Sequence, residues 1–366
     1  MNGYGIDINW IPFILLLPYL FVTARIVQGL SGIKPSAPKR SCDTRVSVII
    51  PTLKGPDSLG PLLSDLALQD YNHDSMEILI ADDSEGLWEG NEGRSEKDPP
   101  HFRVVRNSGK GKKSAIASAI GEATGELIVT TDDDCRAGSE WILTIASHYH
   151  ARKPGMIICP VELSGPKGFF TAMQQLEFAS LQGVTAGSAA LGDPLICNGA
   201  GLAFRRDLFP GKGSVLKDFL SSGDDVFLLH HLKKRGIRIE WLESESAIVR
   251  TAAAGGIFQF LRQRARWSSK ALYYNDTSTM LTGLSVFIAC IVIASFLIMS
   301  LFNTYYIRYA MVMLLVKSLP DILIIMNRLQ FHGRMELLRY FPPVQIVYPF
   351  YVIVSVVAGL FRRREW

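Results

Sequence analysis

The sequence contains few cysteines, and their spacing excludes the sites that cysteines usually build. There are five in 366 residues, and no two of them form a Cys-x-x-Cys pair. Zinc sites and disulfide frameworks need closely spaced or even-numbered sets of cysteines. We therefore predict neither a zinc site nor a disulfide framework. This fits a protein whose cysteines are exposed to the reducing cytoplasm. The five are Cys42, Cys135, Cys159, Cys197 and Cys290.

Net charge is also small. Lys and Arg number 38 against 34 Asp and Glu, which leaves a formal charge of +4. This balance offers no basis for nucleic-acid binding, and a slight basic excess is ordinary for a membrane protein with a cytoplasmic face. The phosphate-binding sequence GxxxxGK[ST] is missing as well, so no Walker A loop is expected.

Long apolar runs, in contrast, are present at both ends of the chain. Trp10 to Leu30 is mostly apolar over about 20 residues, enough to cross a hydrocarbon core of about 30 Å. Its positive charges follow the run instead of preceding it, which favours a retained anchor over a signal peptide and places the following domain in the cytoplasm. Three further apolar segments lie near 281–302, 305–326 and 341–361.

The middle C-terminal segment carries Lys317, Pro320 and Asp321, which we expect to face protein or water because charge at bilayer depth is costly. Three C-terminal spans would leave Arg362–Arg364 outside, against the positive-inside tendency. Either one segment is re-entrant or interfacial, or the count of spans is off by one. We expect an anchor and linker at 1–40, a cytoplasmic catalytic domain at 41–275 and a membrane region at 276–366, hence a multi-pass protein of the cell membrane.

Between the apolar ends, strands and helices alternate. Apolar runs at 46–51 and 127–130 are typical of buried strands, further strands are expected at 76–84 and 101–107, and helices are expected at 58–69 and 109–123. This alternation predicts an α/β fold with a doubly wound, mostly parallel sheet. Ligands of such a sheet bind outside the carboxyl ends of its strands.

The strand at 127–130 runs into three consecutive carboxylates, Asp132, Asp133 and Asp134. Side chains at i and i+2 of an extended segment share a face, so Asp132 and Asp134 point the same way. Two oxygen ligands on one side suit a divalent cation that keeps its other positions for water and phosphate. The alternative is a plain acidic turn.

Polar residues follow two other predicted strands in the same manner. Pro51, Thr52 and Lys54 close the first strand, and Asp82 and Asp83 close the second. The carboxyl ends of parallel strands meet at one edge of a sheet, so these groups should converge with the Asp triplet. The basic start of the second helix, GKGKK at 109–113, is then better read as a phosphate site than as a solvated surface.

Two later stretches complete the set of candidates. Asp224 and Asp225 occupy a helix start, where simple capping is the alternative reading. Gln263, Arg266 and Trp267 fall at i, i+3 and i+4, on one helix face, where the alternative is contact with anionic lipid head groups.

Taken in order, five motifs across about residues 45–270 resemble those of membrane-anchored family 2 glycosyltransferases with the GT-A fold. The branch includes cellulose, chitin and hyaluronan synthases and ceramide glucosyltransferase. The matching stretches are VSVIIPT, ADDS, KKSAI, TTDDDC, and GDD followed by QRARW. The chain departs from the family at GDD, where processive members usually carry Glu-Asp. Asp225 keeps the second acidic position, and Asp224 is expected to play a supporting role.

The resemblance implies a transfer from a nucleotide-diphosphate sugar, expected to be a UDP-hexose, to a lipid or glycan acceptor at the membrane. It implies Mg²⁺ or Mn²⁺ at Asp132 and Asp134, and Asp225 as general base, with inversion to a β-linked product. Nucleotide-sugar contacts are expected at Pro51, Thr52, Lys54, Asp82, Asp83, Lys112, Asp132 and Asp133. Acceptor and diphosphate contacts are expected at Asn198, Gly199, Gly201, Gln263, Arg266 and Trp267.

Two alternatives remain at this point, and a third is set aside. A processive polysaccharide synthase shares QRARW, although three or four spans are few to enclose a polymer channel without oligomerisation. A non-catalytic membrane scaffold would retain the fold alone. A glycosidase also uses paired carboxylates, but it needs neither nucleotide-binding strand ends nor a phosphate-binding lysine, so we set it aside.

Overall fold

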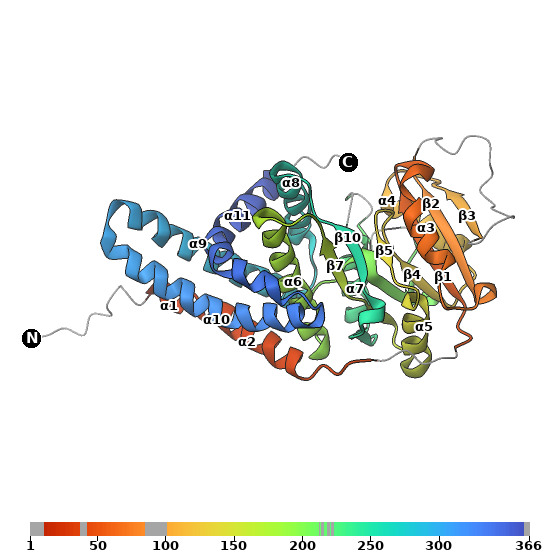
Figure 1. Ribbon diagram of the computed structural model, residues 1–366, viewed down its shortest axis with the longest axis horizontal. Helices are drawn as coiled ribbons and strands as arrows, with labels where there is room; N and C mark the ends of the chain where they lie inside the picture. The colour runs from red at the N-terminus through yellow and green to blue at the C-terminus, as the bar shows by residue number, and fades with distance from the viewer. Residues whose placement is uncertain are drawn as a thin grey trace, which may run out of the picture. The chain divides into compact units, whose positions relative to one another are not determined.

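The structure is a computed structural model that describes residues 11–36, 42–84, 101–211, 213, 216–217, 220 and 223–361. The chain divides into two compact units that interleave along the sequence (Figure 1). The described residues 11–31, 167–187 and 254–361 form one, which we call the helical unit. Those within 32–166 and 188–253 form the other, the sheet unit.

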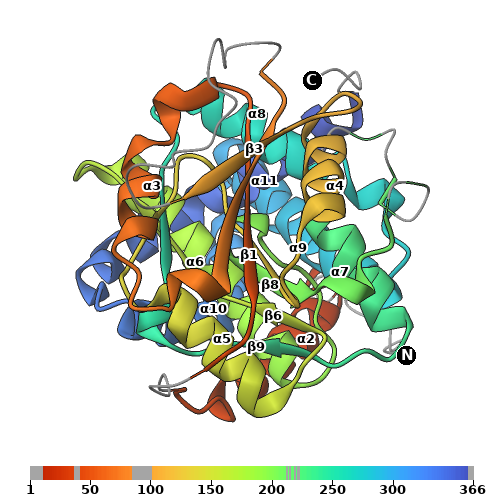
Figure 2. The same ribbon diagram turned by 90° about the vertical axis from the view of Figure 1, so that its right-hand side faces the viewer.

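The sheet unit contains a seven-stranded sheet in the order β3-β2-β1-β4-β8-β6-β9. Only β8 runs antiparallel to its neighbours within this sheet, so the predicted mostly parallel sheet is confirmed. Figure 2 shows β1 in the middle, with helices α3 and α4 to either side of it. The strands are β1 Val46–Thr52, β2 Met76–Asp82, β3 Phe102–Arg106, β4 Leu127–Thr130, β6 Met156–Ile158, β8 Leu202–Arg205 and β9 Ile239–Trp241.

The apolar run of β1 explains its central place. All seven of its residues are buried, as expected of a parallel strand covered on both faces. The unit also contains a second sheet of three strands in the order β5-β10-β7. Its strands are β5 Arg136–Ala137, which comes shortly after the Asp triplet in the chain, β10 Val249–Ala252 and β7 Val161–Ser164. Four helices complete the unit: α3 Gly60–Ala67, α4 Lys112–Glu122, α5 Trp141–Arg152 and α7 Asp224–Lys234.

The largely buried carboxylate of Glu240 links helix α5 to strand β9 through hydrogen bonds. Glu240 accepts hydrogen bonds from His148 Nε2 at 2.8 Å and Arg152 Nε at 2.7 Å, and its side chain is 14% exposed. Burial by itself would raise the pKa of Glu240, but the hydrogen bonds and charges of these two partners lower it from 4.5 to about 2. Folding therefore favours the ionised form.

This lowered pKa predicts an acid-labile contribution to stability. It is fully present above about pH 4.5 and is lost as pH falls toward 2, and it amounts to about 3 kcal/mol. Glu240→Gln should therefore unfold at a lower temperature than the parent at pH 7, with a gap that narrows at pH 3. Thermal midpoints of the detergent-solubilised proteins measure this. A gap that does not change with pH would contradict it.

The helical unit holds four helical stretches long and apolar enough to cross a membrane, at Ile11–Ser31, Thr277–Phe302, Thr304–Phe331 and Met335–Phe361. These match the predicted apolar segments, although Trp10 and Arg362–Arg364 lie outside the described residues. The helices are α1 Ile11–Ile14, α2 Leu17–Ser31, α6 Phe169–Ala190, α8 Ile257–Ser268, α9 Thr277–Phe302, α10 Ile307–Phe331 and α11 Phe341–Phe361.

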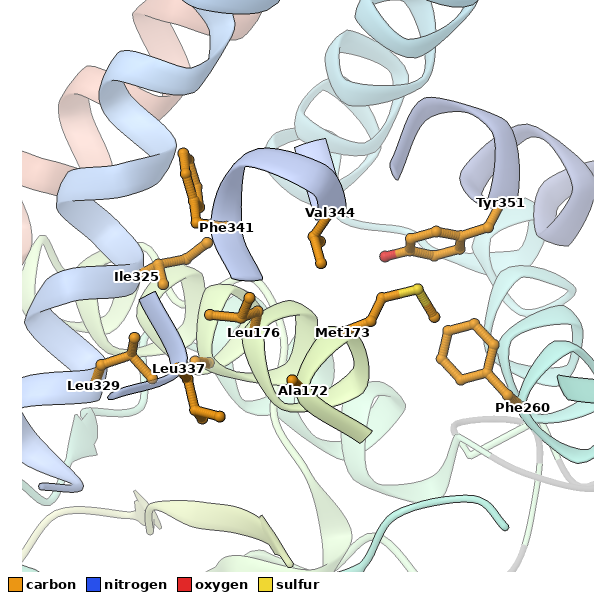
Figure 3. Close-up of a cluster of buried hydrophobic side chains, with 11 residues drawn as sticks. Ala172, Met173, Leu176, Phe260, Ile325, Leu329, Leu337, Phe341, Val344 and Tyr351 are labelled. Carbon is orange, nitrogen blue, oxygen red and sulfur yellow. The ribbon is translucent and has the colours of Figure 1, made fainter. Parts of the chain in front are cut away.

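A buried cluster joins four of these helices (Figure 3). Met173 of α6, Phe260 of α8, Ile325 of α10 and Tyr351 of α11 all belong to it. The rings of Phe260 and Tyr351 meet edge to face with centroids 5.5 Å apart. Helix α6 continues to Ala190, and its C-terminal half packs closely against α2 and α10: a Cβ at Gly187 would clash with the Ile26 carbonyl, and one at Gly183 with the Ile324 side chain.

Lys317 and Asp321 of α10 face protein, as expected. Lys317 Nζ lies 2.5 Å from Asp321 Oδ2 and 3.1 Å from Gln345 Oε1 on α11. Tyr19 on α2 donates a hydrogen bond to the other oxygen of Asp321. Lys317 and Asp321 are 1% and 6% exposed, so the pair neutralises within the bundle charges that would be costly against lipid.

Two glycines bring α2 and α6 into close contact. A Cβ at Gly29 would lie 2.1 Å from the backbone oxygen of Gly187, whereas a Cβ at Gly283 in α9 meets nothing within 4 Å. Gly29→Ala should destabilise the helical unit by about 1–3 kcal/mol through overpacking. Gly283→Ala, the matched control, should be neutral or stabilising by up to about 1 kcal/mol. Thermal midpoints in detergent compare the two, and equal effects would refute the close contact.

Candidate active site

The candidate site lies at the topological switch point of the sheet unit. Strand β1 pairs with β2 on one side and with β4 on the other, and the crossovers leave in opposite directions. Thr52, the last residue of β1, donates from Oγ1 to Asp133 Oδ2 at 2.9 Å, and Ser58 Oγ donates to the same oxygen at 3.1 Å. The carboxyl ends of β1 and β4 are therefore tied together by the middle carboxylate of the triplet.

The carboxylates that close β2 organise the turn before α4. Asp83 accepts hydrogen bonds from Asn107 Nδ2 at 2.7 Å and from the Gly111 N–H at 3.0 Å. Gly111 has φ of +91°, a backbone conformation that favours glycine. Asp82 is buried and accepts from the Ser84 N–H at 3.0 Å. The hydrogen bonds to Asp83 at the end of β2 therefore fix the position of the GKGKK turn, and with it the position of Lys112.

Lys112 places a positive charge at the carboxyl ends of these strands, beside the Asp triplet. Its Nζ lies 2.5 Å from Asp132 Oδ1, and the two side chains remain 31% and 35% exposed. Burial would lower the pKa of Lys112, but the charges of Asp132, Asp224 and Asp225 raise it well above its usual range. The ammonium is therefore charged at neutral pH, partly open to solvent, and close enough to three carboxylates to feel their field.

Asp134, the last carboxylate of the triplet, has less positive charge beside it. Burial, together with the charges of Asp132 and Asp133, raises its pKa, while Lys54 and a hydrogen bond from Thr251 Oγ1 at 3.3 Å act in the opposite sense. A carboxylate whose pKa is raised by burial and by neighbouring negative charge is stabilised in its ionised form by a bound cation.

The chemistry of Asp132 and Asp134 fits Mg²⁺ or Mn²⁺. Both present hard carboxylate oxygens, which such ions take one or two at a time alongside phosphate and water. Among the described residues, no set of three or more His, Cys, Asp or Glu side chains gathers in a way that could hold a metal. An ion here would therefore depend on oxygens of a ligand to complete its coordination.

The acidic start of α7 is connected to the same edge. Asp225 Oδ2 accepts from the Gly199 N–H at 3.0 Å, and the Gly199 carbonyl accepts from Thr130 Oγ1, at the end of β4, at 2.8 Å. Asn198 caps the 3₁₀ turn by accepting from the Ala200 N–H at 3.0 Å. These hydrogen bonds fix the position of Asp225 relative to the Asp triplet. A residue that only caps a helix would not require such a link.

Gly201, the last residue of that turn, is needed for packing. A Cβ there would lie 2.8 Å from Val161 Cγ2 and 3.1 Å from the Cys159 carbonyl. A Cβ at Gly199, in contrast, would only touch Asp225 at ordinary contact distance. Of the two glycines assigned to the acceptor side, Gly201 is therefore the one at which the fold leaves no room for a side chain.

The structure brings most of the predicted site residues together within one unit. Pro51 and Thr52 are buried at the end of β1, Lys54 is exposed beyond it, and the carboxylates and Lys112 follow as described. Gln263, Arg266 and Trp267 belong to α8 in the helical unit, where Arg266 is exposed. Three connecting residues carry no sequence signal that identified them, Ser58, Asn107 and Thr251, whereas Gly111 and Thr130 lie within the GKGKK and TTDDDC stretches.

Comparison with known proteins agrees with this geometry. Residues 47–210 match the family model described as Glycosyl transferase family 2. An N-acetylglucosaminyltransferase of Rhizobium meliloti (strain 1021) is 25% identical over 300 residues, which cover 75% of this chain and 68% of that protein. A dolichol-phosphate mannosyltransferase of Pyrococcus furiosus is 37% identical over 103 residues, 27% of this chain and 28% of that protein.

Among solved structures, the chain is similar to the mannosyltransferase PcManGT from Pyrobaculum calidifontis, determined in complex with GDP-Man and Mn²⁺. The match has a TM-score of 0.58 and 17% sequence identity, and it covers 96% of each chain. At this identity the likeness establishes the fold, a GT-A fold with candidate membrane helices, and nothing finer.

Proposed function

We propose that this chain, whose residues 47–210 match the family 2 glycosyltransferase model, is a metal-dependent, inverting enzyme of that family. It transfers a hexose or N-acetylhexosamine from a UDP-sugar to a lipid acceptor in the membrane and forms one β-glycosidic bond. The observation that carries the proposal is the gathering of Lys112, Asp132, Asp134 and Asp225 around the carboxyl ends of β1 and β4, the place where doubly wound sheets bind ligands.

Donor binding is assigned to the strand ends. Asp82, Asp83 and the Thr52 turn would receive the nucleoside, and Lys112 would offer its ammonium to the diphosphate. Mg²⁺ or Mn²⁺ at Asp132 and Asp134 would supply Lewis-acid stabilisation of the leaving diphosphate. Lys112, held by Asp132, adds a positive charge that needs no reorganisation as negative charge develops.

Acceptor activation is assigned to Asp225. Its Oδ2 accepts from Gly199, which holds the carboxylate in place, and the group can take the proton of an attacking hydroxyl. Direct attack by that hydroxyl on the sugar C1 displaces the diphosphate from the opposite face and inverts the anomeric centre. Gln263, Arg266 and Trp267 are assigned to the acceptor and diphosphate from the resemblance alone.

A membrane lipid is the acceptor that best suits the four candidate spans. We place the sheet unit in the cytoplasm, because positive residues follow the first apolar run. The names of the relatives favour N-acetylglucosamine as the transferred sugar, so UDP-GlcNAc is the first donor to test.

Release of free nucleotide diphosphate tests the proposal. Detergent-purified protein would be incubated with UDP-GlcNAc, UDP-glucose, UDP-galactose or GDP-mannose, each with Mn²⁺, Mg²⁺ or EDTA, with and without membrane lipid. We expect metal-dependent release from one UDP-sugar that lipid stimulates. Growing polymer without added lipid would instead establish a processive synthase. Absence of release from every donor would overturn the enzymatic assignment and leave the scaffold reading.

A further inference from the structure

Helix α8 carries three arginines near its C-terminal end, and only one of them is buried. Arg262 and Arg266 are exposed, whereas Arg264 is 4% exposed. The resemblance assigns a role to Arg266 and none to Arg264, which occupies a variable position inside the Gln-x-x-Arg-Trp motif. A buried arginine needs a partner, since an isolated charge in a low-dielectric surrounding is strongly disfavoured.

That partner is Glu177 of α6. Arg264 Nε donates to both carboxylate oxygens, at 2.8 and 3.0 Å, and Nη2 donates to Oε2 as well. Glu177 is 8% exposed, so both ions are removed from water. A fork-like contact of this kind fixes the plane of the guanidinium, which a lysine at the same position would not do.

The fixed guanidinium in turn contacts two residues of the motif. Its remaining edge donates from Nη1 to Gln263 Oε1. Its carbon Cζ lies 4.2 Å from the centroid of the Trp267 ring, and 4.5 Å from that of Phe260, a member of the buried cluster in Figure 3. One side chain therefore connects the rigid interior of the helical unit with both Gln263 and Trp267.

The contact with Gln263 also decides how its amide is oriented. A guanidinium can only donate hydrogen bonds, so Gln263 must turn Oε1 toward Arg264. Its NH₂ group is then directed away from Arg264. Stacking on Arg264 likewise restricts the rotation of the indole of Trp267, because the cation is attracted to the ring face.

We infer that Arg264, held by Glu177, is a positioning residue that orients Gln263 and Trp267 for the acceptor step. This inference rests on the proposed transferase function. Arg264 takes no part in bond making; it acts through the two residues that it contacts. Its loss should therefore weaken use of the acceptor while leaving the binding of the donor nucleotide unchanged.

The test is Arg264→Lys in the full chain, with Arg262→Lys, on the exposed side of the same helix, as the matched control. Lysine keeps the charge opposite Glu177, so the variant should fold, but it cannot at once pair with Glu177, donate to Gln263 and stack on Trp267. We expect kcat/KM for the acceptor to fall roughly 10²-fold, the effect of about 1 Å of misplacement. KM for the donor and the affinity for UDP should stay within twofold of the parent.

A second variant separates positioning from folding. Arg264→Gln combined with Glu177→Gln removes both charges and so leaves no unpaired ion in the interior. If positioning is the role, this folded double variant also loses acceptor use and still releases UDP slowly by hydrolysis. Parental kcat/KM for the acceptor in either variant would overturn the inference, whereas an inactive parent protein would instead defeat the proposed function.

Discussion

Replacement of Asp225 by Asn is expected to lower the rate of sugar transfer by about 10²- to 10⁴-fold, the range typical of a lost general base. The amide oxygen of Asn can still accept from the Gly199 N–H, so the link between α7 and the end of β4 should persist. What the variant loses is the ability to take the acceptor proton. Turnover is measured as acceptor-dependent UDP release, and UDP affinity by calorimetry.

Asp207→Asn is the matched control for this experiment. Asp207 is exposed and pairs with Arg205, at the opposite end of β8 from the Asn198 turn. The control should keep parental turnover. If Asp225→Asn retained turnover within about threefold of the parent while binding UDP normally, Asp225 would not be the base, and the scaffold reading would regain support.

The second large effect is expected at Lys112. Lys112→Met removes the ammonium that lies 2.5 Å from Asp132, so the developing charge on the diphosphate loses a preorganised partner. We expect kcat to fall by about 10²- to 10³-fold. Nucleotide-diphosphate affinity should fall too, since Lys112 would also contact the bound product. Both quantities come from steady-state kinetics and UDP titration.

Lys110→Met serves as the comparison, because Lys110 sits in the same GKGKK turn but is exposed. It should behave like the parent protein. Similar losses in the two variants would mean that the turn contributes only general positive charge. Normal kcat in Lys112→Met would exclude the assigned phosphate contact, even if the rest of the site proved correct.

The sheet unit was largely predictable from residue patterns. The runs at 46–51, 76–84 and 127–130 are apolar because parallel strands inside a sheet are buried on both faces, and they correspond to β1, β2 and β4. The strand expected at 101–107 corresponds to β3, at the edge of the sheet, where Val105 is the one buried residue of the strand. Ligand-binding polar groups at strand ends follow from the same topology. The convergence of Thr52, Asp83 and the Asp triplet on one edge was therefore expected before their contacts were known.

The individual contacts of the triplet were not predictable. The alternation of an extended segment was expected to separate Asp133 from Asp132 and Asp134, but β4 ends at Thr130 and residues 133–134 form a turn. No local pattern could indicate that Asp133 would accept from Thr52 and Ser58. The partner of Asp134, Thr251, is 117 residues away in the chain. Such pairs depend on how distant segments pack, and periodicity within one segment carries no information about that.

By itself, the sequence determined the α/β class, the four candidate spans, the acidic and basic strand ends and the family resemblance, because these follow from local periodicity, composition and motif order. Only the tertiary structure decided which arginine of α8 is buried, how far α6 extends and how Asp225 is linked to β4. Those outcomes depend on Glu177, on the Gly29–Gly187 contact and on Gly199. Each joins residues far apart in the chain, and close packing selects such pairs only when the whole unit has formed.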